Sequence, residues 1–359
     1  RYLDPRNESE PFSREAARYW MPVDLYVGGV EHAVGHLIYA RFWTMVLHDL
    51  GLLDIEEPAT RLFTQGMITA PSYRCQAHGF VAPDSVRPSD AGPVCPQDGK
   101  LLEVRVEKMG KSKLNSVAPD ELIDRYGADA LRLFSMFGGP PVRDLEWSDQ
   151  GIEGANRFVH RVARLYERLA PAVRGLPLTA DGLAATVSGG AALTLRRKTH
   201  KTIRKVTHDI ELELQLNTAI AALMELVNEL YRVTESADVS ETPDVAAAVA
   251  EALDALSRLL APFAPHLAEE MNAALGRRSL VATASWPRAD GDLLIEDELV
   301  LPVQINGKLR GQVEAPRGAG ERVVLDLVRA DGTISRHLEG KTLARVIHVP
   351  DRLINLVLR

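Results

Sequence analysis

The sequence has only two cysteines, Cys75 and Cys95, among its 359 residues. This scarcity excludes a fold held together by disulfides, so we expect a reducing compartment and a cytoplasmic location. The chain also lacks any apolar run close to the roughly 18–20 residues that a membrane-spanning helix needs. We therefore expect no membrane-spanning segment and no membrane partner.

Residues 1–5 contain neither an initiator methionine nor the apolar stretch of a signal peptide, and we expect the chain to be an inner part of a longer one. Internal repeats and low-complexity tracts are also lacking. Hydrophobic residues make up 46% and charged residues 25%, which is typical of a globular protein and not of a disordered one. The length exceeds that of one ordinary hydrophobic core and predicts two or three domains.

The net charge of −7 argues against a protein that coats nucleic acid, but basic residues are concentrated in one segment. Residues 157–205 contain 11 basic and 2 acidic side chains. Four arginines in this segment recur at steps of three and four, so they share one helical stripe: Arg157, Arg161, Arg164 and Arg168. A second basic cluster opens the next helix: Arg196, Arg197, Lys198, Lys201, Arg204 and Lys205. Such stripes are typical of a solvated helix face, and they also fit a surface that contacts a phosphate backbone.

The pattern of the chain predicts a multidomain fold with an α/β part, an all-α part and a small α+β part. Short strands at 23–27 and 61–69 flank a helix at 31–50, which indicates a parallel sheet with helical crossovers. Residues 71–105 are rich in proline and form a small insert. Helical spacing then runs from Ser148 to about Gly276 and predicts a helix bundle. Alternating apolar residues around Asn306-Gly307 predict a hairpin in the last part. The expected domains are 1–147, 148–287 and 288–359.

A short segment with three lysines is the most specific feature of the sequence: Glu107-Lys108-Met109-Gly110-Lys111-Ser112-Lys113. It follows a sheet-like segment and precedes a helix that begins near Pro119, whose backbone N–H groups favour anions. Flexible ammonium groups suit the spread negative charge of a polyphosphate. The alternative is an exposed lysine-rich turn without a ligand.

Two ligand-like pairs lie in the insert, Cys75-x-x-His78 and Cys95-x-x-Asp98. Two thiolates, one imidazole and one carboxylate can complete a tetrahedral shell, as in a small zinc knuckle, although aspartate is an unusual fourth ligand at a structural site. The alternatives are a knuckle that has lost its metal and two unrelated thiols.

The lysine-rich segment resembles the KMSKS loop of class I aminoacyl-tRNA synthetases, with Gly110 where the family usually has serine. Further segments resemble leucyl-tRNA synthetases of the bacterial type: residues 19–33, 36–43, 62–67, 126–132, 144–149 and 301–311. The resemblance covers nearly the whole chain and is weakest at 71–105 and 175–195. It implies a leucine–tRNA ligase, which activates leucine with ATP to leucyl-adenylate and transfers it to tRNA(Leu).

The resemblance implies that the loop closes over ATP with Mg²⁺, and that Lys108 and Lys111 act in catalysis through contacts to the phosphates. Gly110 removes one hydroxyl and no charge, so phosphate binding is expected to persist. The implied ATP-binding residues are Gly28, Gly29, Glu31, His32, His36, Gln65, Met67, Lys108, Met109, Gly110, Lys111 and Ser112. Two rival interpretations stay open: His32 and His36, one helical turn apart, also fit a metal site, and Met67 also fits plain core packing.

The resemblance also implies tRNA contacts from Arg157, Arg161, Arg164, Arg168, Arg197, Lys201, Arg204, Lys308 and Arg310. A His-x-Gly-His motif, the second signature of class I synthetases, does not occur in the sequence, and an editing domain is not visible. We therefore expect the C-terminal part of such an enzyme, inactive without its N-terminal half as partner. Two other hypotheses are a tRNA-binding module without catalysis and a class I synthetase for valine, isoleucine or methionine.

Overall fold

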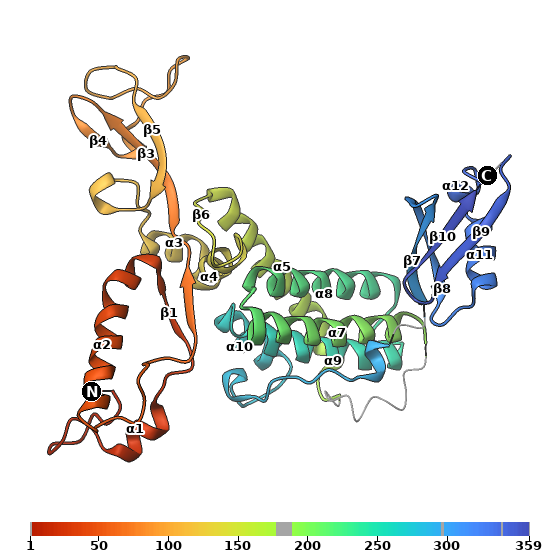
Figure 1. Cartoon of the computed structure of the whole chain (residues 1–359), viewed down its shortest axis with the longest axis horizontal. Coiled ribbons are helices and arrows are strands. Elements are labelled where there is room, and N and C mark those ends of the chain that lie inside the picture. Colours follow the sequence, from red (N-terminus) through yellow and green to blue (C-terminus); the bar gives the residue numbers. More distant parts are fainter. Residues whose placement is uncertain (1, 177–188, 296–297, 339, 359) are drawn as a thin grey trace. The chain divides into compact units, whose positions relative to one another are not determined.

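The computed structural model of the chain describes residues 2–176, 189–295, 298–338 and 340–358. The chain divides into two compact units, Arg1–Arg288 and Ala289–Arg359 (Figure 1). Within the described ranges, no helix is both long enough and apolar enough to cross a membrane. The chain mixes helices and strands, as the sequence predicted.

The first unit begins with the alternating elements that the sequence predicted. They are α1 (Arg14–Trp20), β1 (Tyr26–Gly29), the 3-10 turn η1 (Val30–Val34), α2 (His36–Asp49) and β2 (Leu62–Gln65). Strands β1 and β2 pair in parallel, from Tyr26 opposite Leu62 to Gly29 opposite Gln65. The expected parallel pairing is confirmed, but the helix expected from residue 31 begins only at His36, after the 3-10 turn.

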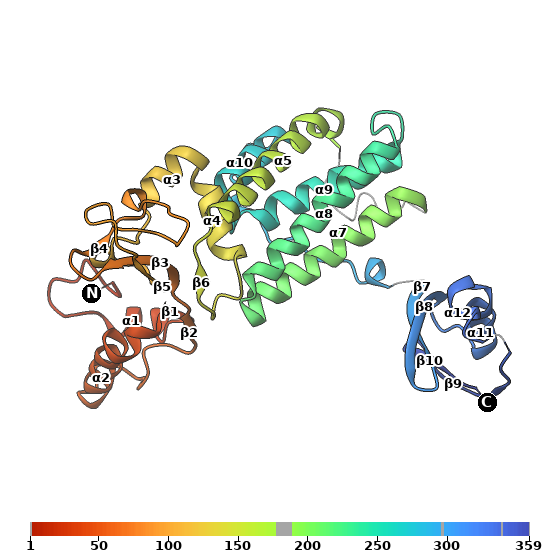
Figure 2. The same ribbon diagram turned by 90° about the horizontal axis from the view of Figure 1, so that it is seen from above.

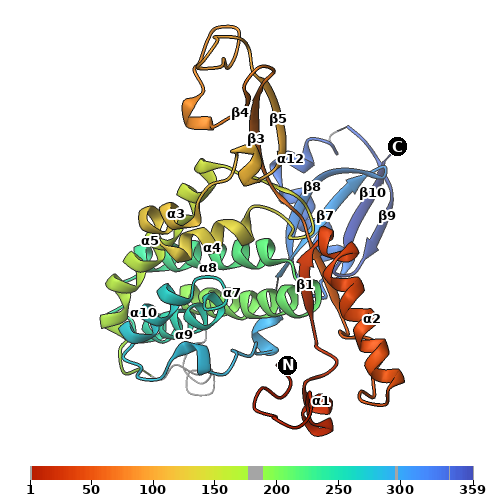
Figure 3. The same cartoon turned by 90° about the vertical axis from the view of Figure 1, so that its left-hand side faces the viewer.

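The strand expected over 61–69 is interrupted at Gly66. This glycine lies so close to the backbone of Arg143 that any side chain would collide with it. Strand β2 ends one residue earlier, at Gln65. The chain then enters a second sheet, in which β3 (Ile68–Cys75) pairs with β4 (Gly79–Val81), β5 (Glu103–Lys108) and the short β6 (Leu145–Glu146). Figure 3 shows β3, β4 and β5 as one ribbon of strands.

Helices make up the rest of the first unit (Figures 1 and 2). They are α3 (Pro119–Tyr126), α4 (Ala128–Phe137), α5 (Asp149–Val173), α7 (Gly190–His208), α8 (Leu216–Ser236), α9 (Pro243–Leu260) and α10 (Pro265–Ala274). Pro119 opens α3, as predicted, and Gly127, at φ 83°, ends it. Apolar side chains of α5 and α7–α10 fill the core, which confirms the predicted helix bundle.

The second unit is a sheet in the order β8-β7-β10-β9 with helix α11 against it (Figure 2). Its elements are β7 (Glu298–Ile305), β8 (Lys308–Pro316), α11 (Glu321–Ala330), α12 (Gly332–Ser335), β9 (Leu343–Val349) and β10 (Leu353–Leu358). Asn306 and Gly307 have φ values of 50° and 80°, so they form the tight turn that was predicted between β7 and β8. Buried side chains of the strands, such as Val303 and Ile354, meet Val324 of α11 in one core.

Candidate functional site: a lysine loop and a cysteine–histidine cluster

The three lysines of the loop differ in their partners. Lys108, the last residue of β5, places its Nζ 2.5 Å from Oε1 of Glu31 on the turn η1. Lys113 forms an ion pair with Glu107. Lys111 is exposed, and within the described part of the chain no carboxylate lies within ion-pair distance of it. Lys111 is therefore the one loop lysine whose charge is not already matched by a carboxylate.

The carboxylates of Glu31 and Glu107 are both stabilised in their ionised form by contacts with the loop. The hydrogen bond from Lys108 holds the pKa of Glu31 below its ordinary value. The pKa of Glu107 is lowered first by Lys113 and then by Ser72, whose hydroxyl lies 2.5 Å from Oε1 of Glu107. The structure thus brings together Glu31 and Lys108, two predicted ATP-site residues that lie far apart in the sequence.

The base of the loop is closed by a buried asparagine. The amide oxygen of Asn115 accepts a hydrogen bond from the backbone N–H of Gly110 (2.9 Å), and its amide nitrogen donates to the carbonyl of Ala70 on β3 (3.1 Å). The side chain is buried, so these bonds replace water and are costly to break. Asn115 lies two residues beyond the lysine-rich segment and was not predicted from the sequence, whereas Glu107 was predicted as the first residue of the segment but without a role.

The other predicted ATP-site residues lie in two groups. Around β1, the hydroxyl of Tyr26 and Nδ1 of His36 are 2.6 Å apart and their rings are stacked, while His32 is exposed on η1. Among the described residues, neither histidine belongs to a group of three or more metal-ligand side chains. Gln65 and Met67 instead line a cavity of about 400 Å³.

That cavity is mainly apolar. Its lining includes parts of β1, β2, the end of α4, the segment between α4 and β6, and the start of α8. Val27, Phe63, Met136 and Leu216 are among the side chains. Met67 also donates its backbone N–H to Asp144 (2.8 Å). Its position in the cavity wall is compatible with the packing role that the sequence left open.

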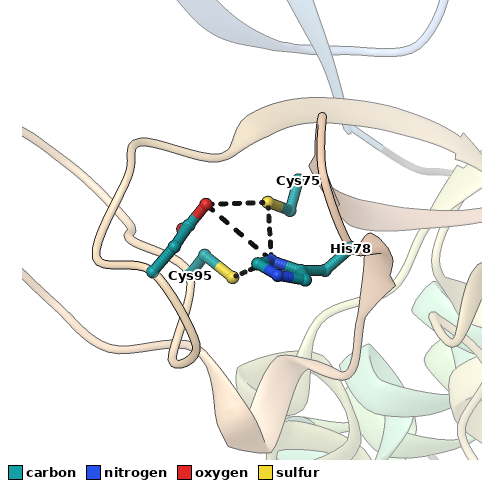
Figure 4. Close-up of side chains that lie close together, drawn as sticks. Cys75, His78 and Cys95 are labelled. Atoms are coloured by element: carbon teal, nitrogen blue, oxygen red, sulfur yellow. Dashed lines mark hydrogen bonds and ion pairs between the residues drawn. The ribbon is translucent and has the colours of Figure 1, made fainter.

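The four side chains of the insert form a compact cluster (Figure 4). Cys75 ends β3, His78 lies in the turn to β4, and Cys95 and Asp98 lie in the loop before β5. Their potential ligand atoms all lie within 4.8 Å of one another. Nδ1 of His78 is 3.4 Å from the sulfur of Cys75 and 3.5 Å from that of Cys95, and Oδ2 of Asp98 is 3.8 Å from the sulfur of Cys75.

Each ligand pair is followed by a glycine in the left-handed region, Gly79 at φ 76° and Gly99 at φ 71°. These glycines turn the chain sharply, and the backbone N–H of Gly99 donates to the carbonyl of Cys95 (2.9 Å). Both cysteines are buried and unoxidised. The pKa of Asp98 is lowered, chiefly by a hydrogen bond from the backbone N–H of Lys100. The site thus offers two thiols and an ionised carboxylate around one imidazole.

The predicted arginine stripe lies on α5, but its members differ in their contacts. Arg161 donates to the side chain of Asn228 (2.6 Å) and Arg168 to the hydroxyl of Thr234 (2.7 Å), both on α8. Both guanidinium groups also lie over the ring of Tyr231. Arg157 and Arg164, like Arg168, are exposed, and Arg157 lies 4.0 Å from a carboxylate oxygen of Glu153, so Arg164 is the stripe member most open to a ligand.

The second basic cluster on α7 is divided between core and surface. Arg196 is buried, and its guanidinium donates to Glu251 (2.8 Å), which His200 also contacts at 3.0 Å. The expectation that Arg196 belongs to a basic surface is therefore wrong. Lys198 and Lys205 form ion pairs with acidic neighbours, whereas Arg204 is exposed. Of the remaining predicted tRNA contacts, Arg197 and Lys201 are partly buried, and Lys308 and Arg310 are exposed on β8.

Two residues of the 126–132 segment join the strand-containing part to the helix bundle. Asp129 accepts hydrogen bonds from the backbone N–H of Leu267 (2.7 Å) and from Nδ1 of His266 (2.9 Å) at the start of α10. Arg132 donates to the carbonyl of Pro262 (2.8 Å). Neither residue was predicted to have this role from the sequence.

Helix α2 leaves much of its apolar side uncovered. Its large exposed side chains include Ile38, Tyr39, Phe42 and Trp43, with exposed fractions between 53% and 73%. A contiguous apolar face of this kind is rare on monomeric proteins and marks an interaction surface.

Two protein-family models match the chain. Residues 98–148, which contain the lysine loop, match tRNA synthetases class I (I, L, M and V). Residues 193–325 match the anticodon-binding domain of tRNA ligase. The first match contains the loop and the Asp129 segment, and the second contains most of the helix bundle.

Curated relatives match the chain almost from end to end. Leucine–tRNA ligases of Desulfatibacillum aliphaticivorans and Maricaulis maris are 41% and 45% identical to it, over 99% of the chain but only 41% and 40% of their own length. A crystal structure of a ternary LeuRS-tRNA-LeuAMS complex (agnB2) from Agrobacterium radiobacter K84 is similar, with a TM-score of 0.75 and 32% identity over 100% of the chain and 41% of that structure. The chain, which spans about two fifths of the length of these relatives, is homologous to the C-terminal part of leucine–tRNA ligases.

Proposed function

We propose that the chain is the part of a leucine–tRNA ligase that supplies the ATP-phosphate loop and tRNA-binding surfaces. The observation that carries the proposal is the lysine loop, in which Lys111 is exposed and unmatched while Lys108 and Lys113 are paired with carboxylates. We propose residues 1–147 as the latter part of a catalytic domain, 148–287 as a helical tRNA-binding domain and 288–359 as a C-terminal tRNA-binding domain. The names of the relatives support this assignment.

In the proposed reaction, a carboxylate oxygen of leucine attacks the α-phosphorus of ATP. A new P–O bond forms, the bond to the β-phosphate oxygen breaks, and pyrophosphate leaves with the electron pair. Negative charge grows on the oxygens of the leaving group, and the Lys111 ammonium lies free to stabilise it. Lys108 reaches the phosphates by exchanging its contact with Glu31 for one with ATP. A tRNA hydroxyl then displaces AMP from the leucyl-adenylate.

ATP would enter with Mg²⁺, which neutralises part of the phosphate charge. In the described residues, the only group of three or more histidine, cysteine or acidic side chains placed to hold one metal ion is the cluster in the insert. The lysine loop itself offers only carboxylates that are already paired with Lys108 and Lys113. The phosphates of ATP would therefore hold Mg²⁺, and the lysines of this chain would neutralise the phosphate charge that the metal ion leaves.

For tRNA, we propose contacts to the phosphate backbone from the exposed arginines Arg157, Arg164 and Arg204. Arg161 and Arg168 would support them by fixing α5 against α8. Lys308 and Arg310 on the second unit would add contacts of the same kind. A plot of the logarithm of the binding constant against the logarithm of the salt concentration becomes shallower by about one unit for each phosphate contact that is lost. Replacing Arg164 by alanine is therefore expected to make this plot shallower for tRNA(Leu).

Leucine-dependent ATP–pyrophosphate exchange tests the proposal. We propose the remaining N-terminal part of the ligase as the partner of this chain, so the assay mixes the chain with that part of the Maricaulis maris enzyme. We expect exchange only in the mixture, and a loss of about 100-fold or more with Lys111→Ala, as for other groups that stabilise transition-state charge. Lys341→Ala, at an exposed lysine outside the loop, is the matched control. Absence of exchange in the mixture, with tRNA binding intact, would reduce the chain to a tRNA-binding module.

We further propose that Cys75, His78, Cys95 and Asp98 hold a structural zinc ion. Bonds of about 2.3 Å to sulfur and about 2.0–2.2 Å to nitrogen or oxygen, arranged as a tetrahedron, place unlike ligand atoms about 3.6 Å apart. The separations of 3.4, 3.5 and 3.8 Å at the cluster agree with this value. Zinc analysis of the purified chain tests the assignment, and Cys95→Ser is expected to release the metal.

A further inference from the structure

The cluster in the insert and the lysine loop are attached to opposite ends of one pair of strands. Strands β3 and β5 pair from Arg74 opposite Glu103 to Thr69 opposite Lys108. Cys75 directly follows Arg74 at one end of this ladder, and Lys108 is the first lysine of the loop at the other end. Strand β4, which follows His78, also contacts the 3-10 turn η3 (Lys111–Lys113). A change in the pairing of β3 with β5 is therefore expected to alter the position of the lysine loop.

The loop end of the ladder is fixed by buried polar contacts. Ser72 on β3 and Asn115 after the loop are both buried. Ser72 bonds to Glu107, which holds Lys113, while Asn115 joins Gly110 in the loop to Ala70 on β3. These contacts exist only while β3 and β5 keep their register, because a slip of one residue turns each side chain to the other face.

The hydrophobic core at the cluster end of the ladder is small. Its buried core consists of Cys75, Cys95 and Leu102, with three partly buried neighbours, Tyr73, Val81 and Val86. So small a core does not offset the conformational entropy of an insert of this length, and modules of this kind depend on a metal or on disulfides. The free thiols exclude a disulfide here, which leaves the four-ligand site as the device that orders this end.

We infer that metal binding at Cys75, His78, Cys95 and Asp98 orders the β3–β5 ladder and thereby fixes the position of the lysine loop. The inference rests on the proposed zinc site, but not on the ligase activity. The metal takes no part in the chemistry, because it lies at the opposite end of the ladder from Lys108. Since linkage is reciprocal, a polyphosphate bound at the loop and a metal bound at the cluster raise each other's affinity.

The test compares the full chain after chelation under reducing conditions with the same chain reloaded with Zn²⁺. Hydrogen exchange of residues 103–115 and tryptic cleavage after Lys111 report the order of the loop. We expect both to be at least about tenfold faster without metal, within the usual range of coupling between two sites. Peptides from α9, which is buried in the bundle, serve as the internal reference and should not change.

Titration with Co²⁺ in place of Zn²⁺ shows whether the cluster binds metal, independently of whether the metal orders the loop. A sulfur-to-cobalt charge-transfer band shows that the thiolates bind metal. If one equivalent of metal binds but exchange and cleavage at 103–115 stay the same, the coupling is wrong and the zinc site stands. If no metal binds, the zinc site and the coupling both fall, whereas the proposed ligase role is tested separately by pyrophosphate exchange.

Three variants test the route of the coupling. Cys95→Ser should lose metal and loosen the loop together. Asp98→Cys supplies a third thiolate and should keep both the metal and the protected loop. Asn115→Ala should keep the metal, yet loosen the loop to the level of the metal-free chain, because it removes the bonds to Gly110 and Ala70. An Asn115→Ala chain with a fully protected loop would contradict the route through the ladder.

Discussion

Gly110 stands in the lysine loop where the resembling family usually has serine, and its surroundings show what the substitution costs. Its backbone is extended, at φ −162°, and the nearest atom to an added Cβ is the hydroxyl of Ser112 at 3.9 Å. A serine would therefore fit without strain. Because the backbone conformation of Gly110 is open to any residue, the main effect of glycine at this position is to make the loop more flexible.

Gly110→Ser is accordingly expected to order the loop without changing its contacts. Replacing glycine at a compatible position stabilises by about 0.4–1 kcal/mol, mainly by restricting the unfolded chain. Hydrogen exchange at residues 109–113 should become slower, and exchange of pyrophosphate in the reconstituted mixture should persist. Gly139→Ser, at a glycine with open space around it, is the control. Faster exchange in the Gly110→Ser loop would show that the glycine is needed for the observed conformation.

Glu251 is buried beside Arg196 and His200. Burial would raise the pKa of Glu251, but hydrogen bonds from His200 and Arg196 outweigh burial and lower it. A lowered pKa means stability that is present above about pH 4.5 and lost as the pH falls through the lowered value. Breaking a buried pair costs about 3–5 kcal/mol.

We therefore expect Glu251→Gln to be much less stable than the parent at pH 7, and the difference to shrink as the pH falls below about 4.5. Urea unfolding followed by far-ultraviolet circular dichroism at pH 7 and pH 4 measures both values. Glu241→Gln, at an exposed position, is the control. A difference between parent and variant that is as large at pH 4 as at pH 7 would assign the effect to packing and not to charge.

At the scale of elements, the sequence predicts best where local chemistry decides the structure. Asn306-Gly307 forms the predicted turn because few other residues accept positive φ at both positions. Cys75-x-x-His78 and Cys95-x-x-Asp98 each form a local turn, and the ligand atoms of the two pairs lie within 4.8 Å of one another. The need for glycine at position 66 depends instead on the backbone of Arg143, and the burial of Arg196 depends on Glu251. Both partners are distant in sequence, so no local pattern reveals them.

The junction between α4 and α10 gives a prediction at the same scale. Asp129 accepts the free N–H groups at the start of α10 and contacts His266, while Arg132 holds the preceding carbonyls. Asp129→Ala leaves buried donors without partners, at a cost of about 1–3 kcal/mol. A lower melting temperature is expected, with Asp124→Ala on the exposed side of α3 as the control. Equal melting temperatures for the two variants would show that α10 finds another cap.

At the scale of the whole molecule, the uncovered side of α2 is the feature that the chain alone does not explain. The chain spans about two fifths of the length of its relatives, so these relatives contain residues that have no counterpart in this chain. An apolar helix face that includes Tyr39, Phe42 and Trp43 fits burial against such residues.

Phe42→Glu tests this assignment, because the side chain is 64% exposed and its replacement should leave the isolated chain folded. Truncation or charging of a central interface aromatic commonly costs about 2 kcal/mol or more, which corresponds to about 30-fold weaker association. We expect Phe42→Glu to reduce exchange of pyrophosphate in the mixture at limiting partner concentration, and a large excess of partner to restore it. Asp49→Ala, with a side chain that is 85% exposed on the same helix, should behave as the parent. If Phe42→Glu associates as tightly as the parent, the apolar face of α2 is not the surface that joins the two parts of the enzyme.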